Sequence, residues 1–268
     1  MHQNEENFDL QTRSAVAVAS FVEFCTKNSI SQPPDKIVKN LCTFLCQDIE
    51  QTPTFALSGK ITDGILSFQI AMKEKPSTVH KNGKDSGKDK ADVPDTEESN
   101  KTRLARRGAG LAFNQLSTKF GGELFEAIPA MWPSMAGGLE STFRTGGRGS
   151  VETSAADSYP DSPSDADALM EKQFGQDVID SLSVLEAIVP SLHQDLWPKL
   201  AKTYPMMHLA LRSRFAIIRQ SAARCFATVC DVVTSQAMRF VIENVLPLLG
   251  DPLSLANRQG AAELIYRM

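Results

Sequence analysis

One sequence unit occurs twice near the C-terminus, and this repetition constrains the fold more than any other feature. Arg219-Gln220-Ser221-Ala222-Ala223 recurs further along the chain as Arg258-Gln259-Gly260-Ala261-Ala262. A period of about 40 residues with two helical patterns per unit is typical of HEAT and armadillo arrays, in which each hairpin buries its apolar face only against its neighbours. The repeat therefore predicts an all-α chain, built as an α-solenoid of HEAT-like or armadillo-like helical hairpins.

The residues of each unit show the spacing of two amphipathic helices. Apolar side chains recur three and four positions apart, first at Phe215, Ile218, Ala222, Cys225 or Phe226, Val229 and Val233 and then at Met238, Val241, Val245, Leu248 and Leu249. This spacing places each set on one face of a helix. The run Gly250-Asp251-Pro252 stops the second pattern, as a turn between two helices requires. Helix, turn, helix is the predicted unit.

Pairs made of a small residue followed by alanine mark where helices are expected to approach closely. Such pairs begin at residues 14, 108, 221 and 260. The wide spacings between the first three exceed one repeat, and we attribute them to inserted loops, which helical arrays accept readily. A further correspondence supports the repeat, since Tyr204-Pro205 is matched about one period later by Leu246-Pro247.

Composition divides the chain into ordered and disordered parts. Two segments are rich in charged residues, Ser and Pro and poor in apolar residues, so they cannot bury enough surface to offset the entropy of the chain. The predicted organisation is HEAT-like helices over 1–74, a disordered charged loop over 75–101, HEAT-like helices over 102–143, a disordered acidic loop over 144–172, and HEAT repeats over 173–268. The apolar pattern from Leu124 to Met135, which contains Pro129 and Pro133, predicts one kinked helix.

The sequence gives few signs of export, membrane insertion or catalysis. The first ten residues are polar and acidic, and no stretch of about 18 apolar residues occurs. The five cysteines lie in apolar helical patterns, so we expect reduced buried thiols rather than a metal site. The stretch Gly83 to Lys88 is too short for a phosphate-binding loop and follows no strand. We therefore predict no catalytic residue, no cofactor and no metal.

Basic residues form the one candidate surface. Residues 199–268 hold nine Lys or Arg against four Asp or Glu, whereas residues 150–180 hold eight acidic residues against one Lys. The candidate interaction residues are Arg103, Arg106, Arg107, Arg212, Arg214, Arg219 and Arg258. On a solenoid face such residues can contact DNA phosphates. Arginines in successive repeats also form ladders with carboxylates of neighbouring helices, and binding of a partner protein is the usual role of such arrays.

Three stretches carry a resemblance to a known family: Asp35 to Cys46, Arg212 to Thr228 and Leu255 to Ala261. They resemble the HEAT-repeat region of the TATA-binding-protein-associated factors, in the modifier-of-transcription branch of the Swi/Snf-class ATPases. The resemblance implies a nuclear regulator that binds TATA-binding protein through its HEAT repeats and removes it from DNA with a C-terminal ATPase motor.

The motor motifs of that family are absent from these 268 residues, and the sequence ends inside a helical pattern. We therefore expect a fragment that is not itself an enzyme, with TATA-binding protein as partner and with neither a membrane nor a small-molecule substrate. The family's contact residues cannot be transferred to positions here. Two other classes stay open: a HEAT adaptor of transport or phosphatase-scaffold type unrelated to DNA, and weak or indirect DNA contact through the basic residues.

Overall fold

The computed structural model describes residues 7–30, 32–46, 97–144 and 165–268, and all regular structure in these ranges is helical. The α-helices are α1 Phe8–Lys27, α2 Gln32–Cys46, α3 Glu97–Phe120, α4 Leu124–Ala127, α5 Met131–Arg144, α6 Asp165–Ile188, α7 Trp197–Leu200, α8 Tyr204–Leu211, α9 Ala216–Val232, α10 Thr234–Phe240 and α11 Leu255–Arg267. The all-α prediction is confirmed for the described residues.

Short helical turns of other types link these helices. They are the 3-10 turns η3 Gly121–Glu123, η4 Val189–Ser191, η5 Gln194–Leu196, η6 Ala201–Thr203 and η8 Leu246–Gly250, and the π-helical turn η7 Val241–Val245. Together α10, η7 and η8 form one continuous helical rod that leads to α11. Pro205 and Pro247, matched in the sequence, both lie in the first turn of their element, where the missing N–H of proline is harmless.

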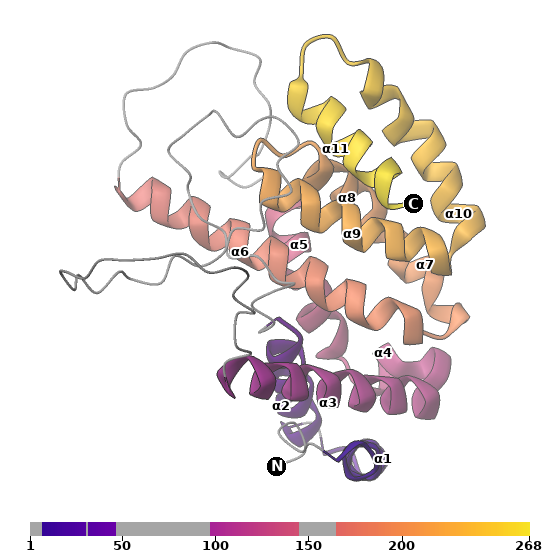
Figure 1. Ribbon diagram of the computed structural model, residues 1–268. Helices are drawn as coiled ribbons and strands as arrows, with labels where there is room; N and C mark the ends of the chain where they lie inside the picture. The colour runs from indigo at the N-terminus through magenta and orange to yellow at the C-terminus, as the bar shows by residue number, and fades with distance from the viewer. Residues whose placement is uncertain (1–6, 31, 47–96, 145–164) are drawn as a thin grey trace, which may run out of the picture.

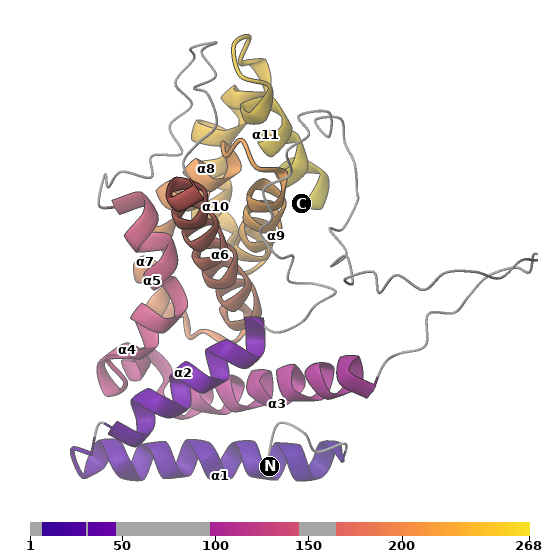
Figure 2. The ribbon, with the colours of Figure 1, turned by 90° about the vertical axis from the view of Figure 1, so that its left-hand side faces the viewer.

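The helices pack in pairs, and the pairs stack on one another (Figures 1 and 2). The packed pairs are α2 with α3, α5 with α6, α8 with α9, and η8 with α11. In one layer α6, α9 and α11 are successive neighbours, and in the other α2 packs on α5 and α5 on α8. Helix α1 packs on α3 and lies at one end of the stack. Each helix thus buries apolar residues against the helices beside it.

Small residues sit where helices cross, as the sequence predicts. The four alanines of the repeated small pairs, Ala15, Ala109, Ala222 and Ala261, are completely buried. Beside the last of them, Gly260 lies against the backbone carbonyl of Leu211, and a Cβ atom at this glycine would overlap that oxygen. The short side chains therefore set the distance between helices.

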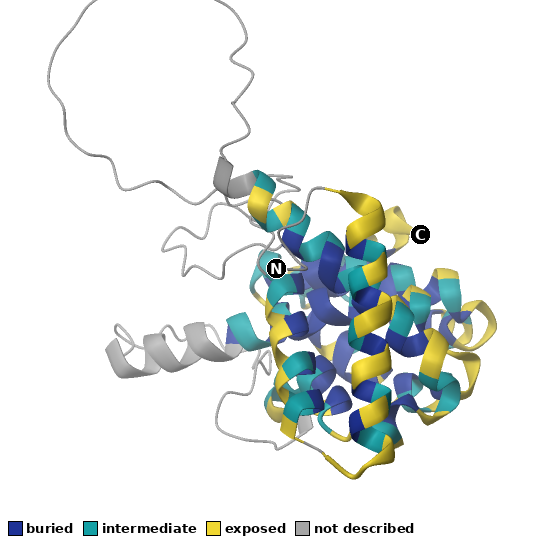
Figure 3. Cartoon of the chain, turned by 90° about the horizontal axis from the view of Figure 1, so that it is seen from below, coloured by how far each residue is buried: buried dark blue, intermediate teal, exposed yellow. Residues whose placement is uncertain are grey.

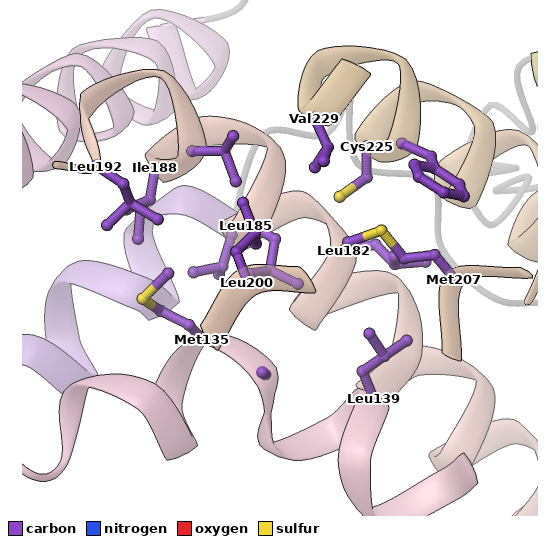
Figure 4. Packing of buried hydrophobic residues seen from close by; sticks show 14 of the residues in the cluster. Met135, Leu139, Leu182, Leu185, Ile188, Leu192, Leu200, Met207, Cys225 and Val229 are labelled. Atoms are coloured by element: carbon purple, nitrogen blue, oxygen red, sulfur yellow. The ribbon is translucent and has the colours of Figure 1, made fainter. Parts of the chain in front are cut away.

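The middle pairs share a continuous apolar core (Figure 4). In Figure 4, Leu182 of α6 lies between Leu139 of α5 on one side and Met207 and Cys225 of α8 and α9 on the other, and Leu185 of α6 lies beside Leu200. These side chains are buried. Removing a side chain of this size from water contributes about 1.5–3 kcal/mol each, so the joint between the second and third pairs is a main source of stability.

Helix α1 ends in a Schellman motif that places one residue in the left-handed region. Ser29 has φ of 56°. The N–H of Ile30 donates to the carbonyl of Cys25 at 2.8 Å, and the N–H of Ser29 donates to the carbonyl of Thr26 at 3.1 Å. These two bonds satisfy carbonyls that the end of a helix would otherwise leave without a donor.

The predicted kinked helix from Leu124 to Met135 is wrong. The chain forms two helices, α4 and α5, separated by residues 128–130. Pro129 falls in this break, where it cannot continue a helix, whereas Pro133 lies in the first turns of α5, where proline is tolerated. The continuous apolar pattern concealed the break because Phe125 before it, Ile128 within it and Met131 after it are all buried.

The edges of the two predicted loops also differ from the structure. Helix α3 begins at Glu97, inside the predicted loop 75–101, and α6 begins at Asp165, inside the predicted loop 144–172. Both helices begin with an acidic residue, a residue type that the helix dipole favours at a helix N-terminus. The rest of both predicted loops, and the untyped element near Ile65, lie outside the described residues.

Among the helices of the described ranges, none combines the length and the apolar character that crossing a membrane requires.

Candidate interaction surface

The candidate arginines fall into two groups near the starts of helices. Arg103, Arg106 and Arg107 lie in the first half of α3, whereas the others lie in the turn before α9, in α9 itself and in the first turn of α11. The N-terminal ends of α3, α6, α9 and α11 all point toward the left-hand side of Figure 1. The structure thus brings the two groups to one edge of the stack, at the N-terminal ends of these helices.

Two arginines of α3 tie the first three helices together. The Arg106 guanidinium donates to the carbonyl of Leu45 at 2.6 Å, in the last turn of α2. The Arg107 Nε donates to Gln11 Oε1 at 2.6 Å, and Gln11 Nε2 donates to the carbonyl of Leu104 at 2.9 Å. Gln11 is completely buried. These arginines therefore satisfy polar groups of α1 and α2, which leaves exposed Arg103 as the outward cation of this group.

Arg219 is 4% exposed and cannot form part of a surface, so its place among the candidates is a wrong prediction. Its guanidinium donates to the carbonyls of Ser213 and Arg214 at 2.9 and 3.1 Å, and to Gln259 Oε1 of α11 at 2.8 Å. Its Nε lies 3.8 Å from a carboxylate oxygen of Glu263. Arg219 thus joins α9 to its own preceding turn and to the next pair.

A second ion pair joins α9 to the helix on its other side. Arg224 Nε donates to Glu186 Oε2 of α6 at 3.1 Å. With the Arg219–Glu263 contact, it gives α9 one arginine–carboxylate contact to each of its two neighbours, α6 and α11. Neither glutamate was singled out from the sequence, although Glu186 precedes Arg224 by close to one repeat.

The remaining arginines surround the turns before α9 and α11. Arg212 Nε donates to Asn257 Oδ1 at 3.3 Å, and Asn257 Nδ2 donates to Asp251 Oδ2 at 2.6 Å. Arg258 donates to the Asp251 carbonyl. Hydrogen bonds from Asn257 and from the Leu253 N–H hold the pKa of the Asp251 carboxyl below its usual range. A stable negative charge therefore sits among these cations and weakens the positive potential of the edge.

Arg214 is the exposed cation of this second group. Its guanidinium stacks over the Phe215 ring at 4.7 Å. Arg103 and Arg214 are thus the two exposed candidates, whereas Arg212 and Arg258 are half-buried. The exposed pair Arg103 and Arg214 forms the candidate surface, the turn edge.

The cysteines and the possible metal ligands of the described residues can be placed in the structure. All five cysteines are free thiols, four of them buried, which agrees with the prediction of reduced buried thiols. Burial raises the pKa of the Cys42 thiol to about 12 and that of Cys230 to about 11, so neither is a thiolate near neutral pH. Within the ranges described, no group of three His, Cys, Asp or Glu could hold a metal ion.

The two ends of the stack expose apolar side chains. At one end the outer face of α1 carries Leu10, Phe21 and Phe24, of which Phe24 is 60% exposed. Seen from below, exposed residues recur along the helix nearest the viewer (Figure 3). At the other end the exposed residues are Ile242, Leu246, Leu249, Leu253, Leu255, Ile265 and Tyr266. Apolar surface gathered in this way indicates contact with another protein segment.

The chain is similar to one family model and to segments of several longer proteins. A family model described as a domain of unknown function (DUF3535) matches residues 3–134. The chain is 36% identical over 270 residues to the TATA-binding protein-associated factor mot1 of Aspergillus fumigatus. It is 27% identical over 267 residues to the factor MOT1 of Saccharomyces cerevisiae, and 26% identical over 301 residues to TATA-binding protein-associated factor 172 of Homo sapiens.

These matches cover nearly the whole chain but a small part of each relative. They include 99%, 99% and 98% of the chain, and 13%, 13% and 15% of the three relatives respectively. The similar region is therefore one helical segment of much larger proteins.

Proposed function

Because this chain is homologous to one segment of the TATA-binding protein-associated factors, we propose that it is a helical scaffold segment of a transcription regulator that binds TATA-binding protein. The observation that carries the proposal is similarity along 99% of the chain to factors whose names state that association. In the longer protein, a C-terminal motor would use ATP hydrolysis to remove TATA-binding protein from DNA, and the protein would act in the nucleus.

The turn edge is the part of this segment that we propose for partner contact. Arg103, near the start of α3, and Arg214, in the turn before α9, are both exposed. The Arg106, Arg107 and Arg219 contacts hold the helices behind them in place. A rigid stack with exposed cations at one edge can present them to a protein surface without ordering long segments on binding, which keeps the entropic cost of association low.

Direct DNA contact has less support from the side chains. Of the seven candidate arginines, Arg106, Arg107, Arg212, Arg219 and Arg258 each donate to groups of other helices or turns of this chain. Phosphate binding draws its affinity from several cations that release counterions together, and Asp251 adds a negative charge at the same edge. The transport or phosphatase adaptor has no support from the relatives, which are factors associated with TATA-binding protein.

A pull-down tests the proposal directly. Immobilised chain is incubated with purified TATA-binding protein, with and without TATA DNA, at near-physiological salt. We expect retention of TATA-binding protein, and a loss of at least about 5-fold for the double variant Arg103→Ala/Arg214→Ala, since rim charges contribute of the order of 1 kcal/mol.

The matched control is Lys202→Ala/Arg239→Ala, which removes two exposed cations from the region of α7 and α10, on the right-hand side of Figure 1. This variant is expected to retain binding. Absence of binding by a chain shown to be helical and folded would overturn the proposal for this segment, and an equal loss in both double variants would show charge attraction without a defined edge.

A further inference from the structure

An aromatic side chain of the rod made of α10, η7 and η8 packs into the pair α8–α9. Phe240, the last residue of α10, contacts the rings of Tyr204 and His208 in α8, at centroid distances of 5.7 and 6.2 Å. Its third neighbour is Phe226 of α9, at a centroid distance of 6.0 Å. Tyr204 and Phe226 are buried. These four residues, the aromatic clasp, connect the start of the rod to both helices of the preceding pair.

The rod changes its helix type immediately after Phe240. Val241–Val245 form the π-helical turn η7, and such single π turns are rare and occur frequently at functional sites. The backbone of Asn244, in this turn, lies close enough to the His208 imidazole to favour its protonated form. His208 therefore lies against the rod at the point where the helical geometry of the rod changes.

The surroundings of His208 suit a neutral imidazole better than a charged one. Burial lowers the pKa of His208, the Arg212 guanidinium one turn along α8 lowers it further, and the Asn244 backbone opposes these effects only in part. The His208 Nε2 is buried and has no hydrogen-bond partner among the described residues. In the protonated ring both nitrogens carry a hydrogen. Protonation would therefore leave a buried donor without an acceptor, which costs free energy.

His208 is the one member of the aromatic clasp that titrates near neutral pH. Burial raises the pKa of Tyr204 to about 12 and the pKa of the Cys230 thiol near it to about 11, so both stay neutral. The charged residues of the rod are Arg239 in α10 and Glu243 in η7, and both are exposed to solvent. A response of the clasp to mild acid therefore depends on His208.

We propose that the aromatic clasp is a pH-sensitive switch, in which proton uptake by His208 releases Phe240 and lets α10 and η7 move away from α8. In the open arrangement the imidazole reaches water, where both of its N–H groups find acceptors. Val233, which separates α9 from α10, provides the hinge. Helix α9 stays in place because the Arg224–Glu186 contact holds it on α6. The proposal concerns the packing of the rod and does not depend on binding of TATA-binding protein.

Native-state amide hydrogen exchange at about pH 7.5 and about pH 5.5 tests the proposal. Each rate is divided by the rate of the unfolded chain at the same pH, so that the protection factor reports the opening of the structure. A histidine in water has a pKa of about 6.5 and is about nine-tenths protonated at the lower pH. Opening that exposes His208 therefore takes up a proton, and acid favours it below about pH 6.5.

We expect the protection factors of α10 and η7 to fall by about 3- to 10-fold between the two pH values, where the upper figure is the limit set by full exposure of one histidine. The protection factors of α9 should stay constant. This comparison uses the wild-type chain alone, so it remains decisive even where a variant is unstable.

Variants assign the effect to one side chain. His208→Phe keeps an aromatic ring in the clasp and removes the titrating group, and His208→Gln removes it with a polar replacement. In both variants the protection factors of α10 and η7 should be the same at the two pH values. The matched control is His193→Gln, which alters an exposed histidine in the turn before η5 and should keep the fall seen in wild type.

Three results would overturn the proposal. Protection of α10 and η7 that does not change with pH in wild type would show that His208 does not control their opening. A fall that persists in His208→Phe would assign the effect to another group. An equal fall in α9 would indicate unfolding of the whole hairpin rather than release of the clasp.

Discussion

At the scale of single residues, Ser29 holds a conformation that suits glycine better. Its φ of 56° lies in the left-handed region at the end of α1, where a Cβ costs about 1 kcal/mol. We expect Ser29→Gly to raise the free energy of unfolding by about 0.5 kcal/mol, since glycine loses part of this gain through its freedom in the unfolded chain. Urea denaturation measures the difference, with Ala17→Gly inside the same helix as the opposite case, expected to lose about 1 kcal/mol. If the free energy of unfolding fell in both variants, the left-handed conformation assigned to Ser29 would be contradicted.

Arg219 is the residue whose removal should cost most. Arg219→Ala leaves two turn carbonyls, Gln259 and the carboxyl of Glu263 without a buried cation. Breaking one partner of a buried charged network typically costs about 3–5 kcal/mol, so the variant should unfold at much lower urea concentration. Arg214→Ala, which alters an exposed guanidinium, should change the free energy of unfolding by less than about 0.5 kcal/mol. Similar losses in the two variants would refute the internal role of Arg219.

Glu263 gives stability a pH dependence with a defined sign. Burial raises its pKa above the ordinary glutamate value, and attraction to Arg219 opposes this only in part. The folded protein therefore binds this proton more readily than the unfolded chain does, so Glu263 destabilises the fold at neutral pH and loses that effect as pH falls through its folded pKa. We expect wild type to gain stability relative to Glu263→Gln between pH 7 and pH 4. If wild type instead lost stability relative to Glu263→Gln between pH 7 and pH 4, the raised pKa assigned to Glu263 would be wrong.

At the scale of elements, two glycines in helices should respond oppositely to the same change. A Cβ at Gly260 of α11 would overlap the Leu211 carbonyl, whereas a Cβ at Gly110 of α3 would have no atom within 4 Å. Gly260→Ala must push α11 away from α8, and we expect a loss of about 1–3 kcal/mol. Gly110→Ala should gain up to about 1 kcal/mol from helix propensity. Thermal denaturation of both variants checks the pair, and a stable Gly260→Ala would show that the helices are not in close contact.

The elements also show what the sequence could and could not predict. Small pairs and prolines located α8, α9 and α11 correctly because those residues act locally, on helix starts and close approaches. The break at Pro129 was missed because buried residues on both sides keep one apolar pattern. The burial of Arg219 was missed for a different reason. Its acceptors are turn carbonyls and a glutamine in the next repeat, and the local sequence does not show which groups a long cationic side chain will contact.

The candidate surface was predictable in composition but not in detail. The sequence identified seven arginines, and the structure divides them by which groups of the chain their guanidinium groups reach. Gln11 and Asn257, which bind Arg107 and Arg212, are buried polar residues with no distinctive spacing. Their roles depend on the register between helices, which is set only when the whole stack has formed.

At the scale of the whole molecule, stacking makes stability depend on position. Helix α9 packs against both α6 and α11, whereas α1 and α11 lie at the two ends of the described stack. In arrays of this kind stability is a sum of repeat and nearest-neighbour terms. We expect amides of α9 to exchange more slowly than those of α1 and α11, by at least about 10-fold, in native-state hydrogen exchange. Equal rates in all three would show a single cooperative unit.

The connections between paired helices differ greatly in length, and this bears on how the molecule assembles. Only residues 212–215 join α8 to α9, whereas residues 47–96 separate the end of α2 from the start of α3. Closing the longer connection costs about 2 kcal/mol more in loop entropy. We therefore expect α8 and α9 to gain protection before α2 and α3 in pulsed hydrogen exchange during refolding, and the reverse order would contradict this. Synthesis on the ribosome delivers α2 and α3 before α8 and α9, so of these two hairpins the one that is made first is expected to gain protection last.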